Sequence, residues 1–74
     1  DVRKSEDNVM LYSVNIILIC ERGGQVEEWE EEVKVVANTP YKVESAVEKY
    51  VNDNIKTADM QNFEWIIEKV EKLN

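Results

Sequence analysis

The sequence contains no histidine, one cysteine, one proline and two glycines. Without histidine, the chain lacks the side chain that most often acts as a general base and as a metal ligand. Because Cys20 is the only cysteine, no disulfide can form within the chain, and a lone thiol is more typical of intracellular than of secreted proteins. These absences favour a non-enzymatic, cytoplasmic protein that holds no metal and no cofactor.

Long apolar segments and basic clusters are also missing. The longest uninterrupted apolar run, residues 16–20, is far shorter than the roughly 20 residues that span a bilayer. Lysine and arginine number 9 against 16 acidic residues, which gives a net charge of −7, and the basic residues are scattered. Direct binding to nucleic acid or to anionic lipid needs clustered basic residues. Neither nucleic acid nor a membrane is therefore expected as a direct partner.

The length of 74 residues fits one domain. Residues 1–8 are polar apart from Val2 and predict a flexible N-terminal arm, so that residues 9–74 form the domain. Domains of this size bury only about 60% of their unfolded surface and often gain stability from self-association.

A β-hairpin is predicted around the two glycines. Residues 9–20 and 26–37 are rich in β-branched residues at alternate positions, and Gly23 and Gly24 suit a two-residue turn. If these glycines form the loop, the numbers of paired residues sum to 47, and Leu18 faces Trp29. One face then carries Met10, Tyr12, Val14, Ile16, Leu18, Trp29, Val33, Val35 and Ala37. The opposite face carries Leu11, Ser13, Asn15, Ile17, Ile19, Glu28, Glu30, Glu32, Lys34 and Val36.

A helix is predicted after the hairpin. Thr39 is a candidate cap and Pro40 suits the first helical position. Apolar residues then recur at helical spacing until residues 52–54, where asparagine and aspartate predict the helix end. The apolar stripe comprises Val43, Ala46, Val47, Tyr50 and Val51.

The last segment, residues 63–73, fits two patterns. As a helix, it has an apolar stripe but places Trp65 on the wrong side. As a strand, it places Phe63, Trp65 and Ile67 on one face, with Ile66 and Val70 on the other. High β propensity and the marginal stability of an isolated hairpin favour the strand. The predicted fold is therefore α+β, a small ββαβ domain with one helix on one face of the sheet, and ββαα is the alternative.

Negative charge is concentrated in the second predicted strand. Residues 21–32 contain six glutamates and one arginine, a local charge of −5. Glutamates on one face of a strand repeat every 6.6 Å or so, which approximates the phosphate repeat of a nucleic-acid strand. The alternative is a charged edge that prevents further strands from adding to the sheet. The predicted partner-binding residues are Glu27, Glu28, Trp29, Glu30, Glu31 and Glu32, with Trp29 as a candidate anchor.

The face opposite the predicted helix carries apolar residues. Soluble monomers rarely expose a large apolar patch, so this face suggests self-association, and Ile66 and Val70 would enlarge it. The predicted self-association residues are Leu11, Ile17, Ile19 and Val36.

In its size, its acidity and its lack of catalytic residues, the chain resembles the small inhibitors that phages and mobile elements encode against host nucleases, including anti-CRISPR proteins. The resemblance implies a viral protein that acts inside a host cell. Together with the acidic cluster, it leads to the hypothesis of an inhibitor that blocks a basic nucleic-acid-binding protein or nuclease by imitating nucleic-acid charge. The competing hypothesis is a structural or regulatory homodimer that associates through its uncovered sheet face or a free strand edge.

Overall fold

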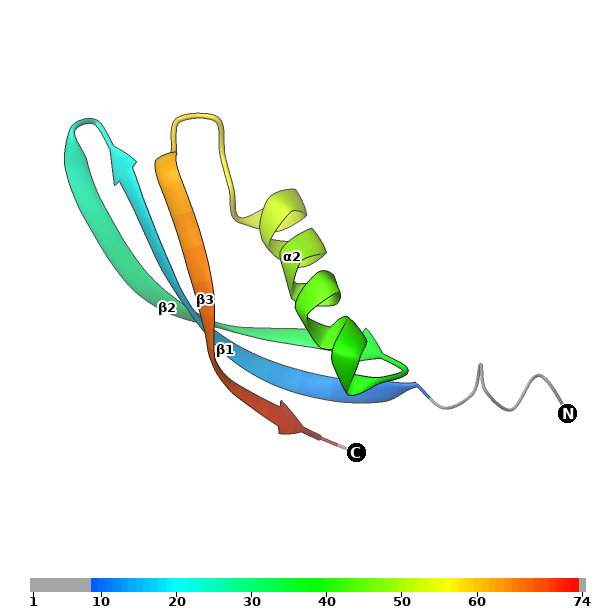
Figure 1. Ribbon diagram of the computed structural model, residues 1–74. Coiled ribbons are helices and arrows are strands. Elements are labelled where there is room, and N and C mark those ends of the chain that lie inside the picture. The colour runs from blue at the N-terminus through cyan, green and yellow to red at the C-terminus, as the bar shows by residue number, and fades with distance from the viewer. Residues whose placement is uncertain (1–8, 74) are drawn as a thin grey trace, which may run out of the picture.

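The computed structural model describes residues 9–73, so the predicted arm of residues 1–8 lies outside the described residues. The chain forms a small α+β domain with the predicted ββαβ order (Figure 1). The last segment is a strand, as favoured from its sequence. The elements are β1 (Met10–Arg22), β2 (Gln25–Ala37), the 3-10 turn η1 (Pro40–Lys42), α2 (Val43–Asn54) and β3 (Gln61–Lys72).

The three strands form one antiparallel sheet in the order β2-β1-β3, so β1 is central and the other two strands are edges. Pairing between β1 and β2 runs from Met10 opposite Ala37 to Arg22 opposite Gln25, the predicted register. Gly23 and Gly24 have φ values of 61° and 79°. Two consecutive positive φ angles define the hairpin turn whose twist matches that of the strands.

The core lies between the sheet and α2, which occupies the concave side of the bent sheet (Figure 1). The predicted hairpin face points into this core. Helix α2 contributes Val43, Val47 and Val51, which are buried at helical spacing. The strands contribute the buried residues Tyr12, Val14, Ile16, Leu18, Val33, Val35 and Ala37, and the partly buried Met10, Trp29, Phe63, Trp65 and Ile67 pack against them. Within residues 9–73, no helix lies on the convex side of the sheet, and we call this side the open face.

A register shift in β3 changes one predicted position. Ile16 lies opposite Ile67, whereas the preceding residue, Asn15, lies opposite Lys69, so Glu68 is an extra residue in β3. An extra residue reverses the alternation of side chains beyond it. Val70 therefore lies opposite Val14, on the helix side of the sheet, and the expectation that it shares a face with Ile66 is wrong.

The helix begins differently from the prediction. Thr39 is extended and makes no side-chain capping bond. Instead, the Lys42 N–H donates to the Thr39 carbonyl at 3.1 Å, which closes the turn η1 beginning at Pro40. The α-helix starts at Val43, directly after this turn.

Candidate protein-binding face

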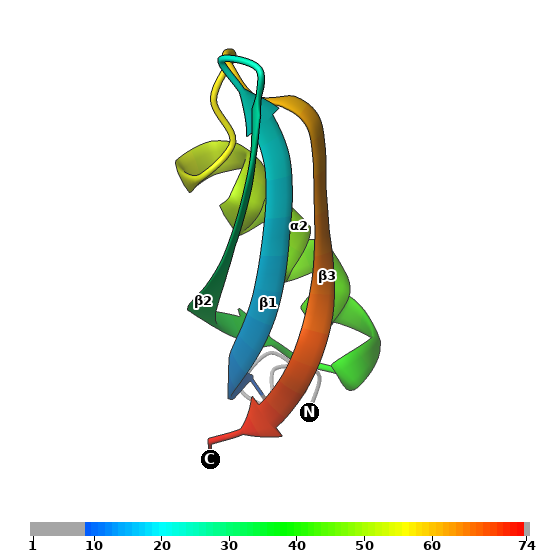
Figure 2. The same ribbon diagram turned by 90° about the vertical axis from the view of Figure 1, so that its left-hand side faces the viewer.

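The acidic segment lies on the edge strand β2, and alternation divides its side chains between two faces. Glu28, Glu30 and Glu32 are exposed and belong to the open face, which is turned toward the viewer in Figure 2. The remaining predicted partner-binding residues, Glu27, Trp29 and Glu31, belong to the helix side. One flat partner surface can therefore engage only half of the predicted set.

The helix-side members of the segment contact other residues of the chain. An oxygen of Glu27 lies 3.2 Å from the Arg22 guanidinium. The indole N–H of Trp29 donates to a Glu31 carboxylate oxygen at 3.1 Å, and the ring packs against the core. Trp29 is half-buried, so it would have to leave this packing to serve as the predicted anchor.

Across the open face, the glutamates of β2 lie next to apolar residues of β1. Glu28 lies opposite Ile19 and Glu30 opposite Ile17. The third strand completes both rows, because Glu64 lies on the other side of Ile19 and Ile66 on the other side of Ile17. We call the set Ile17, Ile19, Glu28, Glu30, Glu64 and Ile66 the acidic-apolar face. Its apolar centre with a charged rim has the anatomy of a protein interface.

Sequence reasoning identified four of these six residues as candidates, and it named Ile66 only as an extension of the apolar patch. Glu64 was missed because the partner of β3 depends on the strand order. Only the position of β3 beside β1, and not beside β2, brings Glu64 next to Ile19.

The predicted self-association residues form two separate groups. Ile17 and Ile19 lie in the acidic-apolar face, whereas Leu11 and Val36 pair with each other near the opposite end of the sheet. Polar rows lie between the two groups. They consist of Lys34, Ser13 and Glu71 in one row and Glu32, Asn15 and Lys69 in the next. The open face is thus not one continuous apolar patch.

The rim glutamates differ in their surroundings. Glu32 accepts a hydrogen bond from the hydroxyl of the buried Ser13. Among residues 9–73, no lysine or arginine forms an ion pair with Glu28 or Glu30. A shallow depression of about 200 Å³ lies between Asn15 and Glu30, Glu31 and Glu32. The strongest uncompensated negative charge of the face therefore lies toward the hairpin tip.

The hairpin tip is connected to the loop that precedes β3. Besides Glu27, the Arg22 guanidinium approaches Asp59 at 3.8 Å, and Glu27 raises the pKa of Arg22. A hydrogen bond from the Thr57 hydroxyl lowers the pKa of Asp59, and the positive charge of Arg22 acts in the same direction. These contacts link the acidic strand to the α2–β3 connection.

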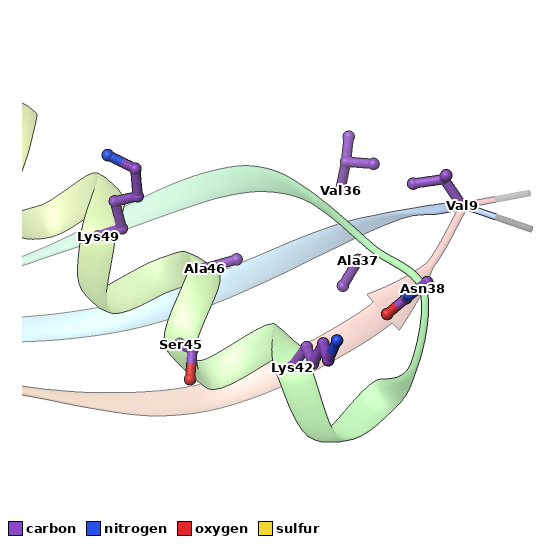
Figure 3. Close-up of a pocket in the computed structure, with 8 residues that line it drawn as sticks. All are labelled: Val9, Val36, Ala37, Asn38, Lys42, Ser45, Ala46 and Lys49. Carbon is purple, nitrogen blue, oxygen red and sulfur yellow. The ribbon is translucent and has the colours of Figure 1, made fainter. Parts of the chain in front are cut away.

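A second surface feature lies between α2 and the free edge of β2. A depression of about 450 Å³ is bordered by Val36 and Ala37 of the strand and by Ala46 of the helix (Figure 3). The Lys49 ammonium at its margin donates to an Asp53 carboxylate oxygen at 2.9 Å, which raises the pKa of Lys49. Lys42 and Ser45 also line this depression.

Within the described part of the chain, no group of three or more metal-binding side chains comes together. None of its helices has the length and apolar character needed to cross a membrane. Comparisons with protein-family models, with curated proteins and with solved structures find no match to this chain.

Proposed function

We propose that the protein is a non-enzymatic inhibitor that binds a basic, nucleic-acid-binding protein through the acidic-apolar face. The observation that carries the proposal is the row of Glu28 and Glu30 on a regular strand, without basic partners among the described residues and next to Ile17 and Ile19. Unpaired like charges in a row repel one another, and a positively charged partner would remove this cost.

The spacing of the row supports a partner that normally binds nucleic acid. Side chains on one face of a strand repeat every 6.6 Å or so, and a surface shaped to bind a row of phosphates presents lysines and arginines at comparable spacing. The apolar centre of the face would add the non-electrostatic part of the contact. The resemblance to small phage-encoded inhibitors makes an intracellular host nuclease the first class of partner to test.

The proposal is tested with two variants of equal net charge. Glu28→Gln/Glu30→Gln changes the acidic-apolar face, and Glu44→Gln/Glu48→Gln changes exposed residues of α2, so both shift the net charge from −7 to −7 + 2 = −5. Immobilised wild type and variants are incubated with extract of the source cells, and captured proteins are compared at increasing salt. Glu32 is kept because it bonds to Ser13.

We expect the α2 variant to capture the same basic protein as the wild type. The face variant should bind it about tenfold more weakly, since two exposed charge contacts of about 0.7 kcal/mol each correspond to that factor. A duplex DNA oligonucleotide should compete with capture, and added salt should weaken it. The proposal would be contradicted if both variants lost capture of the basic protein equally, or if capture were insensitive to salt and to DNA.

A further inference from the structure

Among residues 9–73, no strand lies beside the outer edge of β3, and the side chains of this edge differ from those of the outer edge of β2. A second copy that approached β2 would meet the glutamate run with its own. Edge β3 instead contains five consecutive residues, Glu68 to Lys72, with two acidic and two basic side chains around Val70. These charged side chains are exposed, and Val70 and Leu73 are 46% and 43% exposed. A free edge of this kind can accept another strand.

The backbone of this segment is oriented for pairing. Arg22 and Gln25 flank the two-residue turn and form a hydrogen-bonded pair. Because such pairs alternate along an antiparallel sheet, every second residue of β1, counted back from Arg22, has its backbone hydrogen bonds to β2. The residues between them have their backbone hydrogen bonds to β3. The hydrogen bond from the Leu73 N–H to the Leu11 carbonyl at 2.8 Å agrees with this alternation. Ser13 and Asn15 therefore bond to Glu71 and Lys69. It follows that the backbone N–H and C=O groups of Val70 and Lys72 point away from the sheet.

The sequence of the segment is complementary to its own reverse. When Glu-Lys-Val-Glu-Lys is laid antiparallel to a second copy with Val70 opposite Val70, every charge faces an opposite charge. Glu68 lies opposite Lys72 of the second copy, and Lys69 lies opposite Glu71. Opposite charges in such cross-strand positions stabilise a sheet, whereas like charges destabilise it.

Four of the five matched residues, Lys69 to Lys72, lie in a regular part of the strand. Glu68 is the extra residue at the register shift next to them, and from Lys69 to Lys72 the pairing with β1 is continuous. The outward-facing residues therefore meet outward-facing residues of the second copy, as antiparallel pairing requires. Backbone direction and charge thus agree in one register.

We propose that the protein forms a twofold-symmetric homodimer in which the two β3 strands pair through their outer edges about Val70, giving one six-stranded antiparallel sheet. The dimer leaves the acidic-apolar face of each copy on the open side of the sheet. The proposal does not depend on the proposed inhibitory function.

Two charge variants test the pairing. Glu68→Lys/Glu71→Lys makes the segment wholly basic around Val70, and Lys69→Glu/Lys72→Glu makes it wholly acidic. Each variant would face like charges in a copy of itself, but the two are complementary to each other at all four positions. By sedimentation equilibrium, we expect the wild type to reach twice the monomer mass of 8.7 kDa as concentration rises. Each variant should stay at the monomer mass, and their equimolar mixture should regain the dimer.

The net charges of the variants strengthen the test. The basic variant carries −7 + 4 = −3 and the acidic variant −7 − 4 = −11. If overall repulsion controlled association, the basic variant would dimerise more readily than the wild type. The Glu28→Gln/Glu30→Gln variant should dimerise as the wild type does, so failure of this proposal is distinguishable from failure of the proposed function. Any of three results would overturn the dimer. These are a wild type that stays monomeric, a basic variant that dimerises by itself, and an equimolar mixture of the two variants that stays monomeric.

A cross-link provides a second readout should the charge variants not fold. Residues of a hydrogen-bonded antiparallel pair have Cα atoms about 5.5 Å apart, within the range that a disulfide spans. Val70→Cys should therefore form a disulfide-linked dimer under mild oxidation, and Cys20 can be retained because it is fully buried. Glu64→Cys is the matched control, since residue 64 lies outside the paired segment. Equal cross-linking of the two variants, or none in Val70→Cys, would overturn the pairing.

Discussion

Replacing two carboxylates of the acidic-apolar face should make the isolated protein more stable. Glu28 and Glu30 are exposed, lie on one face of β2 with Glu32, and form no ion pair within the described residues. In Glu28→Gln/Glu30→Gln the repulsion along this row disappears, while the bond from Ser13 to Glu32 is kept. A surface that is selected for binding and not for stability should respond in this way.

The size of the effect follows from the strand geometry. Two unit charges about 6.6 Å apart in water repel by about 0.6 kcal/mol, and screening at 0.1 M salt reduces this to about 0.3 kcal/mol. The variant removes this term between residues 28 and 30 and between residues 30 and 32. It also removes a smaller term with Glu64, two strand spacings from Glu28 across the sheet. Because the unfolded chain keeps part of the repulsion, we expect a gain of about 0.5 kcal/mol.

Urea unfolding followed by the fluorescence of Trp29 and Trp65 measures this gain. The unfolding midpoint of the variant should be higher than that of the wild type at low salt. At 1 M salt, where the screening length is only about 3 Å, the two should coincide. The control is Glu71→Gln on β3, which removes an attraction to Lys69 and should not stabilise. A variant no more stable than the wild type at low salt would refute the reasoning.

Three further substitutions test the fold and the hairpin tip. Ile16→Ala removes a fully buried side chain at the centre of the sheet and should cost about 3 kcal/mol in urea unfolding. Gly24→Ala places a side chain at a φ of 79° and should cost about 1–2 kcal/mol, although no neighbouring atom obstructs the added Cβ. Thr57→Ala should raise the pKa of Asp59 toward its ordinary value, measurable by NMR titration of the carboxyl group. The lowered pKa of Asp59 stabilises the fold above the unfolded-state pKa, and this stabilisation is lost as pH falls through the folded value. Thr57→Ala should therefore be less stable than the wild type near neutral pH, and the difference should disappear in acid.

Local chemistry made the hairpin predictable. Gly23 and Gly24 define the turn, and the turn sets every pair from Met10 to Arg22. The alternation of Val33, Val35 and Ala37 then identified the buried face correctly. The strand character of residues 63–73 was favoured by their high β propensity and by the marginal stability of an isolated hairpin, and β3 (Gln61–Lys72) confirms it, with Trp65 packed against the core.

Long-range geometry was not predictable from these patterns. The extra residue Glu68 leaves no signature in local hydropathy, yet it moves Val70 to the other face. The order of the strands decides that Glu64 and Ile66, and not residues of α2, complete the acidic-apolar face. The contact of Arg22 with Asp59 joins residues far apart in sequence and depends on the path of the loop before β3.

The most direct test of the binding face is to map backbone amide chemical shifts of the isotope-labelled protein while the captured basic partner is added. The account predicts that the largest changes occur at Ile17, Ile19, Glu28, Glu30 and Ile66, with α2 unaffected. Changes confined to α2 and the depression beside it in Figure 3, with the amides of Glu28 and Glu30 unmoved, would contradict it.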